Sequence, residues 1–198
     1  MVSLGAHQPP AALGASALPA QLPAPQQLPR ELEQAEITAM LDCADLDTKI
    51  ALSALLCGVG PQELLALTWK DVDSDTNTIR IGQPVPRSIQ IAPEIAILWK
   101  ALRRQKNGAP EDNLIGEAGA APLNLSHLEA LISYAAHDAA LQHPADVTPW
   151  AVRHTFISYL VRQGVRFSEI ARIVGTLPAE VTAAYGLMQP AGARPSIE

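Results

Sequence analysis

The acidic stretch DVDSDTN, residues 71–77, is the first candidate for chemistry, because its carboxylates are spaced like the start of a calcium-binding loop. An EF-hand loop needs glycine at its sixth position and glutamate at its twelfth, and this chain has Thr76 and Gly82 there. The histidines show no metal-ligating interval with one another or with the cysteines: His7, His127, His137, His143 and His154. We therefore expect ordinary turn chemistry at residues 71–77, and neither a metal site nor a cofactor.

The stretch GVGPQEL, residues 58–64, has the shape of an anion site at the start of a helix. Proline is favoured at the first position of a helix, where its missing N–H would be unpaired anyway, so Pro61 is expected to begin one. Gly60 leaves the N–H groups of that helix end open, which suits an anion. The turn supplies no charged side chain to hold an anion, so the site looks empty.

The segment FSEIARIVGTLPAEVTAAY, residues 167–185, has the spacing of a helix-turn-helix, with Ala171, Gly175 and Val181 at its key positions. A helix that reads base edges offers arginine, lysine, asparagine or glutamine. The second helix of this segment offers Ala179, Glu180, Ala183 and Ala184 instead. We interpret the segment as a compact helical corner that does not read bases.

Composition narrows the class of protein further. The chain has 198 residues, of which 48 % are hydrophobic, enough for one domain with a tail. A formal net charge of −6 argues against a protein that mainly grips phosphate backbones. The chain lacks a run of about 18 apolar residues and a basic leader, so we expect a cytoplasmic protein that does not bind membranes. Cys43 and Cys57 are expected to be buried thiols in a reducing compartment.

Residues 1–30 are rich in proline, alanine and glutamine, and are expected to form a disordered arm. A globular unit is expected from residue 31 to residue 188, followed by a flexible tail over residues 189–198. Its apolar spacing predicts helices, with Asp45 or Asp47, Ser126 with Glu129, and Thr148 with Pro149 at helix starts.

Alternating isoleucines in TNTIRIG and RSIQIAP predict a hairpin over Thr78–Ile91. The fold class expected from these elements is α+β, mainly helical, with one small antiparallel sheet.

Two long motifs carry a resemblance to a known family. CGVGPQELLALTWKDVD, residues 57–73, follows the pattern T-G-L-R-x-x-E-L-x-x-L-x-W-x-D-I-D, and TPWAVRHTFISYLVRQG, residues 148–164, follows T-P-H-x-L-R-H-T-F-x-x-x-L-x-x-x-G. These are the boxes of the catalytic domain of tyrosine recombinases, the phage integrase family, which the chain resembles from about residue 31 to residue 188. The resemblance implies the catalytic-domain fold of that family.

The family's chemistry explains the residue types that it needs. A tyrosine attacks a DNA phosphodiester and forms a 3′-phosphotyrosine, while two arginines clamp the non-bridging oxygens. A hairpin lysine protonates the leaving oxygen, and two histidines, the second sometimes tryptophan, assist. In members of the family an N-terminal helical domain usually closes around DNA, and we expect the proline- and alanine-rich arm to stand in that place here.

The resemblance implies that two of these six positions are kept, as Arg153 and Tyr185. The other four are substituted, by Gly60 (first arginine), Gln83 (hairpin lysine), Trp150 (histidine of the second box) and Thr176 (later histidine). The empty anion site then has an explanation, because Gly60 stands where the family has an arginine. We expect Arg153 to pair with a carboxylate such as Glu63, and Tyr185 to end a helix with its hydroxyl at the surface. Gly60, Arg153 and Tyr185 are expected to converge on one concavity.

These substitutions predict a tyrosine recombinase-like protein that is inactive in strand cleavage and acts as a regulatory or binding module. Its expected partners are DNA, bound weakly, or a partner recombinase or a second copy of itself, with no small-molecule substrate. Two alternatives stay open. One is an active site-specific recombinase that forms a 3′-phosphotyrosine through Tyr185, and the other is a decayed fragment of a mobile element.

Overall fold

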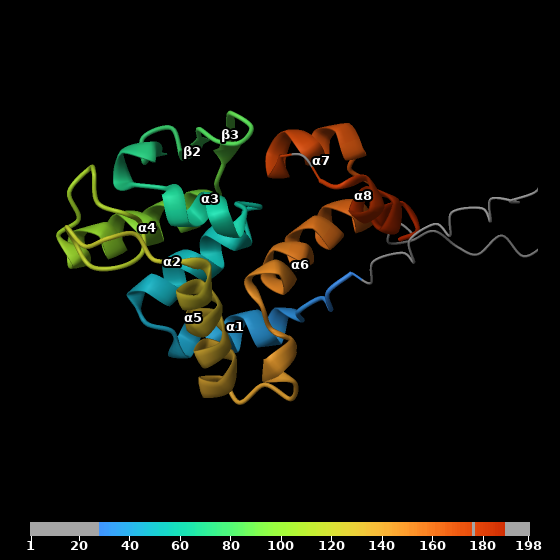
Figure 1. The fold of residues 1–198 in the computed structure, drawn as a ribbon, viewed down its shortest axis with the longest axis horizontal. Helices are drawn as coiled ribbons and strands as arrows, with labels where there is room; N and C mark the ends of the chain where they lie inside the picture. Colours follow the sequence, from blue (N-terminus) through green and yellow to red (C-terminus); the bar gives the residue numbers. More distant parts are fainter. Residues whose placement is uncertain (1–27, 176, 189–198) are drawn as a thin grey trace, which may run out of the picture.

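The computed structural model describes residues 28–175 and 177–188 (Figure 1). Eight α-helices, two short 3-10 helices and three strands follow one another in this part of the chain: α1 (Gln34–Cys43), α2 (Leu46–Leu55), α3 (Pro61–Ala66), η1 (Trp69–Asp71), β1 (Val72–Asp73), β2 (Thr78–Ile81), β3 (Arg87–Gln90), α4 (Pro93–Lys106), α5 (Leu125–Asp138), η2 (Pro144–Asp146), α6 (Pro149–Arg162), α7 (Phe167–Val174) and α8 (Ala179–Gly186). The expected fold class, mainly helical with a small antiparallel sheet, is confirmed.

Local signals in the sequence set most helix starts. Asp45 caps α2, where its carboxylate accepts the Thr48 N–H at 2.8 Å. Pro61 begins α3 and Pro149 begins α6, as their lack of an N–H predicts. These three starts are confirmed.

The start of α5 differs from the expectation. The helix begins at Leu125, because the Asn124 side chain accepts the His127 N–H at 3.0 Å. Asparagine caps a helix as well as serine does, and this register leaves Ser126 inside the first turn. The predicted capping box of Ser126 with Glu129 is therefore wrong.

The sheet has the strand order β1-β2-β3, and both pairs are antiparallel. Ile79 lies opposite Ile89 in the pair of β2 with β3, so the alternating isoleucines share the buried face, and the predicted hairpin is confirmed. The acidic turn between β1 and β2 closes on itself, because the Asp73 carboxylate accepts the N–H groups of Asp75 and Thr76. These hydrogen bonds, that of Thr76 first, hold the pKa of Asp73 below its ordinary value.

Buried side chains form two clusters. The larger one lies among α1 to α5 and the sheet, with Trp69 and Trp99 among its largest members. The smaller one joins α6, α7 and α8. In Figure 1, α7 and α8 lie beyond α6, away from α1 and α5. Helix α6 contributes to both clusters, since Val152 belongs to the first and Ile157 to the second. Residues on α6 are therefore placed at the junction of the two.

The two cysteines differ in their exposure to solvent. Cys57 is buried, as expected, and burial raises the pKa of its thiol to about 12. Cys43 is exposed, because it is the last residue of α1, where the backbone turns to an extended conformation at Ala44. The expectation of two buried thiols is wrong for Cys43.

In the part of the chain that the structure describes, no helix combines the length and the apolar character that crossing a bilayer requires. Within the same residues, no three histidine, cysteine, aspartate or glutamate side chains come close enough together to hold a metal ion.

Candidate active site

Helix α6 carries Arg153 into the junction between the two clusters. The side chain is buried, and 7 % of the residue is exposed. Its Nε donates to the Gly58 carbonyl at 3.1 Å, and its Nη2 donates to the Val174 carbonyl. Arg153 thus ties the turn before α3 to the end of α7. Burial lowers the pKa of this guanidinium, and the charge of Glu63 opposes that shift.

The expected pairing of Arg153 with Glu63 is wrong, because Glu63 pairs with Arg87. The two Arg87 nitrogens Nη1 and Nη2 donate to the Glu63 carboxylate at 2.6 and 2.7 Å. Arg87 Nε donates to the Ile173 carbonyl at 2.8 Å, so this one side chain joins β3, α3 and α7. Sequence reasoning missed Arg87, because its partner lies 24 residues away and no periodic pattern connects the two.

The anion site at the start of α3 is filled by the chain itself. Glu63 Oε2 accepts the Gly60 N–H at 2.7 Å, as the third residue of a capping box does. A side chain at position 60 would crowd this carboxylate, since a Cβ there would lie 3.0 Å from Glu63 Oε2. Glu63 supplies the anion and Arg87 supplies the cation, so the interpretation of this helix end as empty is wrong.

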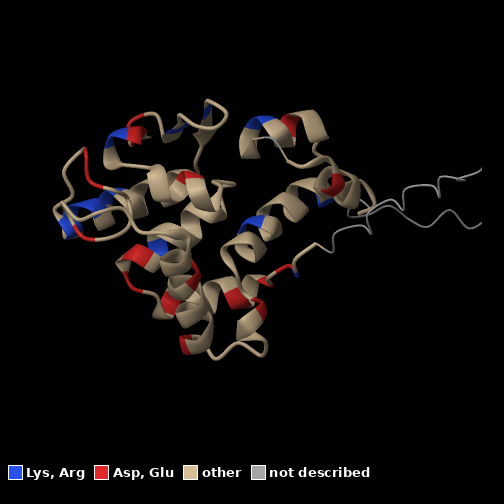
Figure 2. Ribbon diagram, in the orientation of Figure 1, with Lys and Arg blue, Asp and Glu red and all other residues tan. Residues whose placement is uncertain are grey.

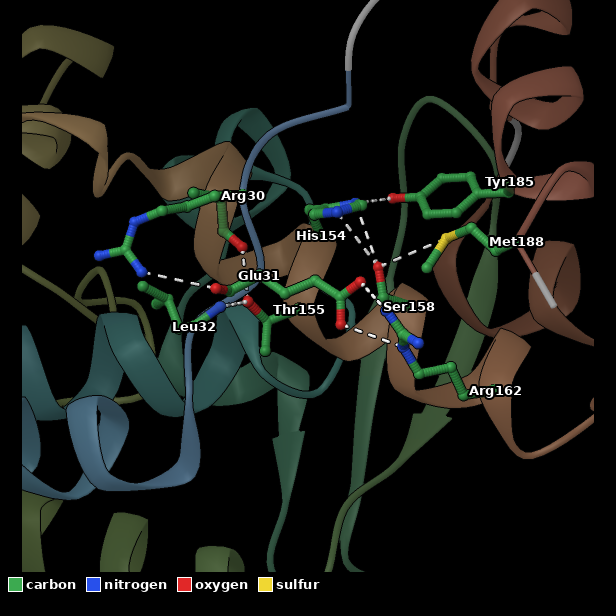
Figure 3. Close-up of polar contacts among 10 residues, drawn as sticks. Arg30, Glu31, Leu32, His154, Thr155, Ser158, Arg162, Tyr185 and Met188 are labelled. Atoms are coloured by element: carbon green, nitrogen blue, oxygen red, sulfur yellow. Dashed lines mark hydrogen bonds and ion pairs between the residues drawn. The ribbon is translucent and has the colours of Figure 1, made fainter. Parts of the chain in front are cut away.

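Tyr185 is buried and not at the surface. Helix α8 packs onto α6, and 2 % of Tyr185 is exposed. Its hydroxyl lies 2.6 Å from His154 Nδ1 (Figure 3). Burial raises the pKa of the Tyr185 hydroxyl, and the charge of Arg153 opposes the shift. The expected surface hydroxyl is therefore wrong, because α8 folds back and encloses the ring.

His154 completes a buried polar chain. It follows Arg153 on α6, and burial lowers the pKa of its imidazole. Ser158, one turn further along α6, places its Oγ 3.1 Å from His154 Nε2. With all three side chains uncharged, both ring nitrogens of His154 have a hydrogen-bond partner when the Tyr185 hydroxyl donates to Nδ1 and the Nε2–H donates to Ser158 Oγ. The phenol is held in its protonated form by this arrangement.

The segment over residues 28–32, called the strap below, lies along α6 beside these groups (Figure 3). The Leu32 N–H donates to Thr155 Oγ1 at 2.9 Å, and Glu31 pairs with Arg162 at 2.7 Å. Leu28 packs against the smaller cluster. Leu28 and Arg30 thus make contacts within the fold, although the sequence assigns them to the disordered arm. Residues 1–27 of that arm and the tail over residues 189–198 lie outside the described residues.

A cavity of about 480 Å³ brings together three of the six site positions inferred from the sequence. Arg153, Tyr185 and Trp150 line it. Gly60 is not part of its wall, so the predicted convergence is confirmed for Arg153 and Tyr185 only. Gln83 lies exposed in the turn between β2 and β3. Thr176, the sixth position, lies outside the described residues.

Comparison with known proteins gives the same fold. The phage integrase family matches residues 26–189. The structure is similar to XerA recombinase (TM-score 0.70, 24 % identity, 82 % of this chain and 62 % of that chain). It is also similar to XerH site-specific recombinase bound to its difH substrate in a pre-cleavage complex (TM-score 0.68, 17 % identity, 82 % and 51 %).

A third similar structure is the Tn1549 transposon integrase in complex with transposon right end DNA (TM-score 0.64, 19 % identity, 83 % and 63 %). This chain thus spans 51–63 % of these three structures. No curated protein sequence matches the chain.

Proposed function

Because the chain belongs to the phage integrase family, we propose that it is a recombinase-fold domain that does not cleave DNA and acts as a binding or regulatory module. One observation carries this proposal: both retained family positions are committed to packing. Arg153 donates to two backbone carbonyls, and the Tyr185 hydroxyl is enclosed against His154.

Transition-state chemistry supports the loss of cleavage. Removing a single donor to the developing negative charge typically lowers a rate by about 10²–10³. Gly60 and Gln83 stand at two positions where the family has cations, and Arg87 does not replace them because its donors are used by Glu63 and the Ile173 carbonyl. A protonated tyrosine that is 2 % exposed is a poor nucleophile for a phosphodiester.

One observation favours the alternative of an active recombinase. Tyr185 and His154 stand at the distance of a nucleophile and its general base, 2.6 Å. His154 is held neutral by burial, so it is able to accept a proton. This pair would act on DNA only if α8 moved away from α6 and exposed the phenol.

The distribution of charged residues over the described part of the chain indicates what kind of partner it can bind. Cations gather on α4 and near it, where acidic residues also lie, and further acidic residues are spread over α1, α2 and α5 (Figure 2). Residues 111–148 contain no lysine or arginine at all. The side of α4 presents the exposed cations Lys70, Arg80, Lys100 and Arg104, and the acidic turn between β1 and β2 lies beside them. Two further exposed arginines, Arg166 and Arg172, lie at α7. A duplex would therefore meet only small patches of favourable potential. Weak DNA binding, or binding to a recombinase, fits this pattern better than tight binding.

The test is the affinity for a short duplex as a function of salt, measured by fluorescence anisotropy. We expect weak binding with a slope of log K against log salt no steeper than about −4, because the four exposed cations on the side of α4 neutralise at most about four phosphates. Replacing Lys100 and Arg104 by glutamine should reduce the slope by about 2, whereas Arg162→Gln, on α6, should not change it. Absence of salt-dependent binding would remove DNA as the partner and leave a protein.

A further inference from the structure

The cavity between α6, α8 and the strap holds a buried cation that lacks a counter-charge. Arg153 belongs to none of the ion pairs in the described part of the chain. The partners of its Nε and Nη2 are neutral carbonyls, and Nη1 has no hydrogen bond to any described residue. A buried charge without an opposite charge is costly to a fold. This arrangement favours an anion supplied from outside.

The nearest carboxylate does not fill that role. Glu63 acts on Arg153 through its charge, but both of its oxygens bind Arg87. Arg87 is itself a cation near Arg153 and adds to the positive potential there. The cavity therefore presents one guanidinium whose charge the surrounding residues do not neutralise.

Apart from His154 and Tyr185, whose polar atoms are hydrogen-bonded to each other, the rest of the cavity wall is apolar or aromatic. The Trp150 ring lies 5.9 Å from Arg153 Cζ, while Leu177 and Val181 form the side towards α8. Leu28 and Pro29 of the strap close another side. A volume of about 480 Å³ lies in the range of small-molecule sites, which are mostly apolar with a few fixed polar groups.

These features define one class of ligand. A guanidinium matches the planar, bidentate geometry of a carboxylate, and an aromatic body suits the face of Trp150. A doubly charged phosphate would leave one of its charges without a partner in an apolar wall. We propose that this cavity binds a small aromatic monocarboxylic acid, with the carboxylate on Arg153 and the ring against Trp150.

The inference rests on the proposed loss of cleavage, since in an active enzyme this guanidinium would face DNA. Binding would also join the strap to α8, because Leu28 and Val181 lie on different walls of the same cavity. A small acid would then control how tightly the strap and α8 are held on α6. That is a means by which a binding module can respond to a metabolite.

The first test compares 3-phenylpropanoate with 3-phenylpropanamide, which differ in charge and not in shape. The signal is the Trp150 indole N–H in ¹H–¹⁵N spectra. Trp69 and Trp99, each 1 % exposed and remote from the cavity wall, serve as internal controls. We expect the acid to bind about 10- to 100-fold more tightly than the amide, because a hydrogen bond to a charged group is worth that much. Equal affinities, or no shift of the Trp150 signal, would overturn the proposal.

Two variants and one control variant locate the site. Val181→Phe fills the cavity and should weaken binding of the acid at least 10-fold. Val85→Phe makes the same change on the exposed hairpin, outside this cavity, and should leave the affinity unchanged. Arg153→Met should remove the preference for acid over amide. If that variant does not fold, the acid-to-amide ratio of the unmodified protein and the Val181→Phe result decide the matter.

Inorganic phosphate is the third probe. If it shifts the Trp150 signal at lower concentration than 3-phenylpropanoate does, the cavity is a phosphate site and the proposal is wrong. The proposed loss of cleavage is judged separately, from covalent complexes with DNA. Failure of one proposal is therefore not mistaken for failure of the other.

Discussion

The ion pair of Arg87 with Glu63 should be the interaction on which the junction of β3, α3 and α7 most depends. The two side chains are 6 % and 10 % exposed, and two short hydrogen bonds join them. Arg87→Met leaves the Glu63 carboxylate buried with only the Gly60 N–H as a partner. Removing one member of a buried pair typically costs about 3–5 kcal/mol. Because the Gly60 N–H remains, we expect a loss of about 3 kcal/mol.

The assay is urea unfolding followed by circular dichroism, with thermal unfolding as a second measurement. A loss of about 3 kcal/mol lowers the melting temperature of a domain of this size by about 6–12 °C. Arg162→Met is the matched control, because its pair with Glu31 is 48 % and 33 % exposed and should contribute no more than about 1 kcal/mol.

A double-mutant cycle separates the pair from its surroundings. Glu63→Gln combined with Arg87→Met should cost clearly less than the sum of the single changes, because the two side chains interact directly. If Arg87→Met costs no more than Arg162→Met, or if the two single changes simply add, the pair does not hold this junction together. The start of α3 would then not depend on the ion pair of Glu63 with Arg87.

Three further outcomes follow from the buried polar chain and the thiols. Tyr185→Phe should lower the free energy of unfolding by about 1–3 kcal/mol, because it removes the hydrogen bond between the Tyr185 hydroxyl and His154 Nδ1. A hydrogen bond of this kind contributes about 1 kcal/mol, so a change below about 0.5 kcal/mol in urea unfolding would mean that it does not stabilise the fold. The pKa of His154 is lower in the folded protein than in the unfolded chain, so the unfolded chain binds the extra proton. Stability should therefore fall as pH drops below about 6.5, and it should fall less in a His154→Gln variant. Iodoacetamide should modify Cys43 and spare Cys57 in the native protein, since Cys43 is exposed and burial raises the pKa of Cys57 to about 12; modification of both at equal rates, read by peptide mass, would contradict the structure.

The features that could be predicted from sequence are those set by neighbouring residues. Pro61 and Pro149 fix helix starts through a missing N–H, and the isoleucines of β2 and β3 fix a buried face through their alternation. The second box of the recombinase family depends on the same local order, so it located Arg153, and the resemblance that continues beyond that box located Tyr185. Local signals of this kind can be recognised in the sequence without knowledge of the tertiary structure.

The surroundings of the site could not be predicted, because they depend on how distant elements pack. The burial of Tyr185 follows from α8 folding back onto α6, and nothing within α8 indicates this. Glu63 has Arg87 as its partner because the hairpin brings β3 to α3. Motif positions alone suggested an empty anion site, whereas the packing shows one that is filled by the chain itself.

We propose that Tyr185 serves packing and not strand cleavage. The most direct measurement is to incubate the protein with a nicked suicide duplex, in which cleavage would release a short fragment and trap the enzyme on its DNA. The products are separated under denaturing conditions, and the Tyr185 peptide is examined by mass spectrometry, with Tyr185→Phe as the control. We expect no covalent complex, in the unmodified protein or in a Gly60→Arg variant, because Gln83 and Trp150 stand where the resemblance places the hairpin lysine and the second-box histidine. A nucleotide joined to Tyr185 in the unmodified protein, and absent from the phenylalanine variant, would contradict it.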